Sequence, residues 1–198
     1  MNFPYGEWII FFITLVTFIE KRISRWFFLK LAKVWLLGKL FEVVLASESV
    51  WHYHYARMAV MLFVGGYAWK RTRRKFWPLI LTSFALGVEI LFQVNDPGVL
   101  PFSSLIFALA LASVAWLTAK SYWGTALALI GSVLLNQGFE RVVYEGILRH
   151  VDLPDPFIWN FGVIFLTVWA GLRLGWRTYY QEAKALPVFD SANDQDLK

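Results

Sequence analysis

The sequence predicts an all-α polytopic membrane protein with seven transmembrane helices. Of its 198 residues, 58% are hydrophobic and 19% are aromatic, which is more apolar surface than a soluble domain of this size needs to build a core. Seven mostly apolar stretches fill nearly the whole chain, and a bilayer-spanning helix needs about 20 such residues. The loops between the stretches alternate between basic and acidic, which is typical of a membrane protein with a fixed orientation.

Each span is recognised by its apolar run and by the residues that end it. The expected spans are Pro4–Ile19, Trp26–Ala46, Trp51–Trp69, Phe76–Val94, Val99–Ala119, Tyr122–Leu148 and Pro156–Tyr180.

The first span is closed by Glu20-Lys21-Arg22, with no basic residue before it and no small-residue cleavage site after it, so we expect a span and not a signal peptide. The second ends in the polar segment Ser47 to Val50, and the third ends at the basic run Lys70 to Lys75. Asn95-Asp96-Pro97-Gly98 is a tight-turn sequence and separates the fourth span from the fifth.

Lys120 separates the fifth span from the sixth. The segment from Asp152 to Pro156 contains two prolines, cannot continue a helix, and therefore separates the sixth span from the seventh. After the seventh span the composition becomes polar, so residues 1–180 are expected to form one transmembrane domain and residues 181–198 a disordered cytoplasmic tail.

The basic residues predict the orientation. Most of them fall in the loops after the odd-numbered spans, namely Lys21, Arg22, Arg25, Lys30, Lys33, Lys70, Arg71, Arg73, Arg74, Lys75, Lys120, Arg177 and Lys184. The opposite loops carry Glu48, Asp96, Asp152 and Asp155 against Arg149. Because cytoplasmic loops are enriched in Lys and Arg, the N-terminus is expected outside and the C-terminus inside.

Composition also excludes several function classes. The net charge of +5 comes from residues at helix ends, so nucleic-acid binding is not expected. The chain has no Cys, which excludes disulfides, thiolate catalysis and Cys-ligated metals. His52 and His54 are two residues apart near aromatic side chains, and the third histidine is His150 in a loop, so neither a metal nor any other cofactor is expected.

Two segments suggest an internal repeat. Leu36 to Val44 and Leu134 to Val143 share a double Leu, a Phe-Glu pair and a double Val, with one residue, Arg141, inserted after the pair in the second segment. Both lie in spans that run from inside to outside, which suggests a parallel 3+1+3 arrangement of the kind found in transporters. Chance similarity between apolar helices is the alternative.

Polar and ionisable residues within the spans gather at the outer half of the bilayer. The residues expected to line a polar cavity there are Lys39, Glu42, Arg57, Glu89, Gln93, Gln137, Glu140, Arg141, Tyr144 and Glu145. Such residues are costly in a membrane and usually face protein or water. Lys39 and Glu42 are three apart on a helix and are expected to pair.

Two interpretations of these residues stay open. The first is a water-accessible cavity that faces outward and binds a small solute or a proton, for which we expect Glu42, Glu89, Glu140 and Arg141 to be central. The second is a network of ion pairs and hydrogen bonds that only fixes the packing of the helices.

The chain resembles the YphA-type family of small bacterial integral membrane proteins, seen mainly in Gram-positive spore-formers, over most of its length. The residues that carry the resemblance are Glu20-Lys21, His52-Tyr53-His54, Phe92-Gln93 followed by Asp96-Pro97, and Gln137-Gly138 with Tyr144 and Ile147-Leu148. The family has no assigned activity, so the resemblance implies a location in the bacterial cytoplasmic membrane and carries over no functional residue.

We therefore expect a multi-pass protein of the bacterial cytoplasmic membrane that handles a small solute or protons, with the lipid bilayer as its surroundings. One alternative is an assembly or signalling component with a protein partner or a second copy of the chain. The other is a membrane enzyme acting on lipid head groups, although no catalytic motif accompanies the carboxylates.

Overall fold

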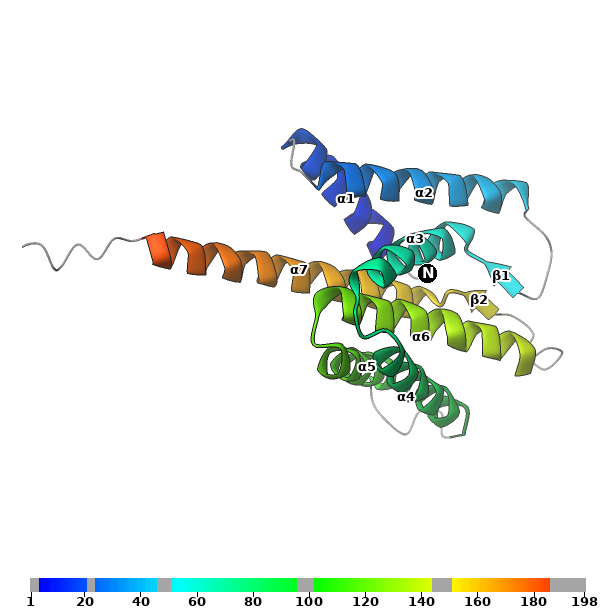
Figure 1. The fold of residues 1–198 in the computed structure, drawn as a ribbon. Helices are drawn as coiled ribbons and strands as arrows, with labels where there is room; N and C mark the ends of the chain where they lie inside the picture. Colours follow the sequence, from blue (N-terminus) through cyan, green and yellow to red (C-terminus); the bar gives the residue numbers. More distant parts are fainter. Residues whose placement is uncertain (1–3, 21–23, 46–50, 96–101, 144–150, 186–198) are drawn as a thin grey trace, which may run out of the picture. The chain divides into compact units, whose positions relative to one another are not determined.

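Seven α-helices make up most of the protein (Figure 1). The computed structural model describes residues 4–20, 24–45, 51–95, 102–143 and 151–185. The helices are α1 (Tyr5–Ile19), α2 (Arg25–Val44), α3 (Tyr55–Arg71), α4 (Phe76–Asn95), α5 (Ser103–Ala119), α6 (Tyr122–Val143) and α7 (Pro156–Ala185). The predicted all-α class is confirmed, as are the seven helices.

The helix boundaries agree closely with the sequence wherever a turn former, a proline or a charge ends the apolar run. Helices α4, α6 and α7 begin at their expected first residues. Helix α7 continues to Ala185 and so enters the segment expected to be a tail, of which residues 186–198 lie outside the described part. The expected end of the second span and of the sixth span, and the start of the fifth, also lie outside it.

One boundary was predicted wrongly. The third span was expected to begin at Trp51, but Trp51–Tyr53 forms a strand, β1, and α3 begins at Tyr55. The reason is a parallel pairing with a second strand, β2 (Val151–Leu153), in which Trp51 lies opposite Val151 and Tyr53 opposite Leu153. The His54 amide continues the ladder by donating to the Leu153 carbonyl at 2.8 Å.

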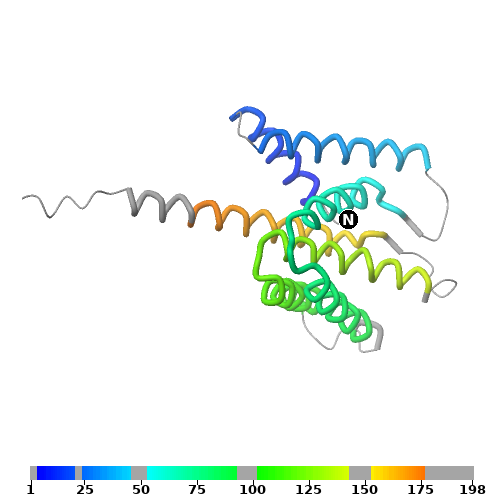
Figure 2. The backbone as a smooth tube through the Cα atoms, viewed as in Figure 1, coloured from blue at the N-terminus to red at the C-terminus, as the bar shows by residue number. Residues whose placement is uncertain are grey.

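Helices α3 and α6 are central to the first of the two units into which the chain divides, Met1–Phe165. They pack against each other; α2 packs against α3 and α1 against α2, while α4 and α5 both pack against α6 and against each other. Figure 2 allows the backbone to be followed from α5 into α6. The described part of the second unit, Leu166–Lys198, is the C-terminal part of α7.

The first unit buries small side chains and exposes large apolar ones. Ala68 and Ala115 in two different helices are fully buried, as is Thr82 in α4. In contrast, Phe12 is 65% exposed and Phe84 is 72% exposed. Small residues between helices and large apolar residues on the outside are typical of helices that pack within lipid, and this much exposed apolar surface is rare on a soluble monomer.

Only one stretch among the described residues, Pro156–Trp176, is both long and apolar enough to cross a membrane on its own. Three more helices or parts of helices are apolar but shorter, Tyr5–Ile19, Phe76–Phe92 and Ser103–Ala119. A single such helix also occurs in soluble proteins and in signal sequences. The seven membrane spans therefore stay a prediction.

Candidate functional site

The candidate site lies where α2, α4 and α6 end and where α1, α3 and α7 begin. Hydrogen bonds join α2 to α3, α1 to α3 and α1 to α7, and the β1–β2 pair connects the segment before α3 to the segment before α7. Asn136 joins α6 to α4, and Arg141 of α6 lies over the Tyr53 ring of β1. We call this region the polar end of the first unit. Most of the charged residues named from the sequence lie here.

Glu42 caps helix α3 from the neighbouring helix. Its Oε1 accepts a hydrogen bond from the Ala56 amide at 3.0 Å, and its Oε2 forms an ion pair with Lys39. The expected pairing of Lys39 and Glu42 is confirmed. Because the His54 side chain at the N-cap makes no capping hydrogen bond, the carboxylate of Glu42 takes that role, accepting from a free amide and meeting the positive end of the helix dipole.

Arg57 joins three helices through a residue that sequence reasoning missed, Glu7. The Arg57 Nε donates to Glu7 Oε1 at 2.8 Å, and Trp159 Nε1 on α7 donates to Glu7 Oε2 at 3.2 Å. The Gly6 amide donates to Asn160 Oδ1 at 2.8 Å. The available signal was a carboxylate in the first turn of an apolar helix, which is costly unless it has a partner.

Two buried donors at this end have no hydrogen-bond partner among the residues that the structure describes. They are Nη1 of Arg57, a residue only 9% exposed, and the hydroxyl of Tyr53 on β1. The guanidinium of Arg141 lies over the Tyr53 ring, with Cζ 5.7 Å from the ring centroid. A buried donor without a partner costs about 1–3 kcal/mol, so each such group calls for a functional or structural reason.

Three carboxylates form the acidic side of the polar end. Glu89 on α4 is buried, and the charge of Asp155 acts electrostatically on Glu89 and on Glu140. Asp155 caps the N-terminus of α7, since its Oδ1 accepts hydrogen bonds from the Phe157 amide at 2.8 Å and the Ile158 amide at 3.0 Å. Gathered carboxylates create a negative potential that attracts cations and protons.

Asn136 connects α6 to α4 just beneath these groups. Its Nδ2 lies 3.0 Å from Ser83 Oγ, 3.1 Å from the Ser83 carbonyl and 3.0 Å from the Ser132 carbonyl. The neighbouring Gln137 is partly buried. A polar bridge of this kind between apolar helices holds two segments in register.

Some of the expected residues fall outside the described part of the chain. Gln93 lies in α4, but its side chain is outside the described part. Tyr144 and Glu145 lie outside the described residues entirely. Among the described residues, no three His, Cys, Asp or Glu side chains are grouped so as to hold a metal ion.

Comparisons with models of protein families, with curated proteins and with solved structures found no match to this chain. The resemblance to the YphA-type family therefore stays a prediction.

Proposed function

We propose that the chain is a seven-span protein of the bacterial cytoplasmic membrane, with its N-terminus outside, whose polar end binds a small polar solute or a proton. The proposal combines three kinds of support, which are the exterior of the helices, the difference between the two ends of the first unit, and the unpartnered donors at the polar end.

The exterior of the helices supports a membrane location. Exposed large apolar side chains recur along α1, α4 and α5, for example Phe11 at 61%, Ile80 at 54% and Leu109 at 51% exposure. In water this surface would drive association, whereas in a bilayer it meets lipid chains. Lys39 and Glu42 of α2 form an ion pair at the polar end, and Arg57 of α3 pairs with Glu7 there.

The two ends of the first unit differ in charge, which supports the orientation. The polar end holds the carboxylates of Glu7, Glu42, Glu89, Glu140 and Asp155. At the other end, Phe27, Tyr67 and Trp123 from three different helices pack together, and Arg71 covers the Tyr67 ring with Cζ 4.4 Å from its centroid. A basic end is expected on the cytoplasmic side.

The unpartnered donors of Arg57 and Tyr53 carry the binding proposal. A structural network would satisfy its buried donors, because an unpaired donor in a low-dielectric interior is expensive. A solute that offers an oxygen acceptor to Arg57 Nη1 or to the Tyr53 hydroxyl would remove that cost. Arg57 is suited to this role because Glu7 already holds its Nε and so orients the guanidinium.

The test is a screen of amino acids, sugars and inorganic ions for stabilisation of the purified protein against heat, compared between wild type and variants. We expect a stabilising solute whose effect is lost in Tyr53→Phe and in Arg57→Lys. The matched control is Tyr67→Phe, which removes a hydroxyl at the opposite end and should keep the effect. Stabilisation that is equal in all variants, or absent in wild type, would contradict the proposal.

A second candidate function is favoured by the pairs themselves. Lys39 with Glu42, and Glu7 with both Arg57 and the indole of Trp159, are the contacts expected of a network that only holds helices together in an assembly or signalling protein. Glu140→Gln separates the two candidates. A solute- or proton-handling protein should lose uptake or efflux and keep its folded level, whereas a packing network should lose folded protein.

The 3+1+3 repeat also stays a proposal. In its favour, β1 before α3 and β2 before α7 take corresponding places in the chain. Against a close symmetry, Gly38 lies against the backbone of α3, whereas Asn136, at the corresponding position of the second segment, bonds to Ser83 of α4.

A further inference from the structure

We propose that the turn between α3 and α4, together with the exposed face of α4, binds an anionic phospholipid. The turn comprises residues 70–75, of which all but Thr72 are basic. The head group would lie at the turn and an acyl chain along the helix. This inference rests on the proposed membrane location, and it assigns a ligand to the end opposite the polar end.

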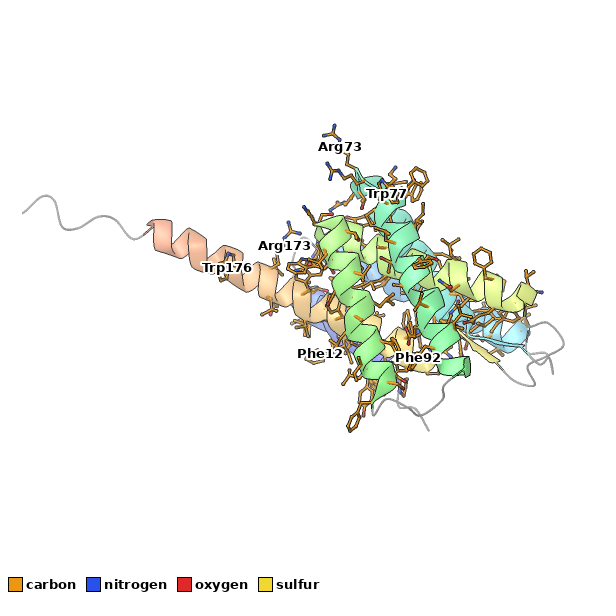
Figure 3. The ribbon with its side chains drawn as sticks, turned by 90° about the horizontal axis from the view of Figure 1, so that it is seen from below. Phe12, Arg73, Trp77, Phe92, Arg173 and Trp176 are labelled. Carbon is orange, nitrogen blue, oxygen red and sulfur yellow. The ribbon has the colours of Figure 1, made fainter. Side chains whose placement is uncertain are left out.

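The positive charge of the turn has no compensating carboxylate nearby in the sequence. The nearest acidic residues are Glu48 and Glu89, which lie far along the chain on either side. Arg73 and Arg74 are exposed, and neither forms an ion pair or a hydrogen bond within the part of the chain that the structure describes. Figure 3 shows Arg73 pointing away from the helices.

Aromatic rings hold two of the other cations of the turn, Arg71 and Lys75, in place. Lys75 Nζ lies 4.7 Å from the centroid of the Trp69 ring, and Arg71 Cζ lies 4.4 Å from that of Tyr67 and 5.5 Å from that of Trp123. Thr72 is buried and its hydroxyl donates to the Ala68 carbonyl at 2.8 Å. The turn is therefore a fixed cationic surface with two guanidinium groups left to meet a phosphate, which Arg recognises with paired donors.

An apolar stripe continues from the turn along α4. The stripe consists of side chains at helical spacing that are 40–72% exposed, namely Trp77, Ile80, Leu81, Phe84 and Val88. At 1.5 Å per residue it extends about 16 Å, which is about half of the ~30 Å hydrocarbon core. A charged turn that leads into an apolar stripe of one-leaflet length matches a phospholipid, whereas a nucleic acid or an acidic peptide would leave the stripe uncovered.

The test measures lipid retention by native mass spectrometry after purification in mild detergent with phosphatidylglycerol or phosphatidylcholine added. We expect wild type to retain phosphatidylglycerol in preference to phosphatidylcholine, and excess inorganic phosphate not to displace it. In the double variant Arg73→Gln/Arg74→Gln the retention should fall by about 25-fold, since each basic residue near an anionic surface contributes roughly fivefold.

The matched control is Lys30→Gln/Lys33→Gln, which removes the same charge from two exposed positions of α2 and should keep the preference. Equal losses in both double variants would overturn the proposal, as would a wild type without preference. Phe84→Ala, at the far part of the stripe, should weaken retention of both lipids without changing the head-group preference. Fractionation of the cells comes first. Absence of the protein from the membrane fraction would refute the proposed function. Presence in that fraction without a preference for phosphatidylglycerol would refute this inference alone.

Discussion

Replacing Gly38 with Ala should separate α2 from α3 at the polar end. A Cβ at this position would lie 2.5 Å from Ala56 Cα, 2.8 Å from the Tyr55 carbonyl oxygen and 2.9 Å from the Ala56 nitrogen. All three are backbone atoms, which cannot rotate away as a side chain can. Non-bonded carbon atoms need about 3.5–4.0 Å, so α3 must move by about 1 Å.

The cost follows from this displacement. Forcing an extra methyl group into a packed interface costs about 1–3 kcal/mol. The movement also weakens the bond from the Ala56 amide to Glu42, and a hydrogen bond to a charged group is worth about 1.5–3 kcal/mol. Ala gains about 1 kcal/mol over Gly in helix propensity, so the expected net destabilisation is about 2–5 kcal/mol.

Thermal unfolding in detergent, followed by circular dichroism, measures the effect. A shift of about 2–4 °C per kcal/mol gives a Tm roughly 5–15 °C below wild type. The control is Gly66→Ala on α3, where a Cβ meets nothing within 4 Å among the described residues, so only the propensity gain acts and the Tm should hold or rise. If Gly38→Ala melts with or above the Gly66→Ala variant, the close approach of α2 and α3 is wrong.

Three more predictions test the polar end and the orientation. Glu7→Gln should destabilise the fold by about 3–5 kcal/mol because it leaves Arg57 buried without a counter-charge; in a double-mutant cycle, Glu7→Gln/Arg57→Gln should then cost less than the two single variants together, and strict additivity would show that the pair is not coupled. Asn136→Ala should lower the free energy of unfolding by about 1–3 kcal/mol through loss of its bonds to Ser83 and Ser132, measured by the same thermal assay, and an unchanged Tm would argue against that bridge. Because the chain has no native Cys, a membrane-impermeant thiol reagent should label Arg73→Cys only from the cytoplasmic side and Phe102→Cys only from outside, and labelling of both from one side would refute the seven-span orientation.

Local signals in the sequence were enough to place most helices. Helix α4 begins directly after the basic turn, α6 after Lys120-Ser121, and α7 at a proline that follows a capping aspartate. Each of these signals acts within a few residues, as does the pairing of Lys39 with Glu42 one turn along α2. The free energy that decides such features comes from neighbours in the chain, so a single sequence carries it.

The start of α3 could not be predicted in this way. Trp51 to Tyr53 is aromatic and apolar enough to extend the helix, but the backbone groups of these residues pair with a strand 100 residues later. Pairing between segments so distant in the chain depends on how the intervening helices pack. No pattern within residues 51–53 therefore predicts their pairing with residues 151–153.

By itself the sequence determined the helices, their order and the chemical contrast between a basic and an acidic set of loops, because hydropathy, helix periodicity and turn chemistry act over short distances. Only the tertiary structure decided which charges meet between different helices. Glu7 bonds to Arg57 across 50 residues and to the indole of Trp159 across 152. The backbone of α3 packs against Gly38, whereas no described residue packs against Gly138. Those partnerships depend on the distances between packed helices, which are set by side chains far apart in the chain.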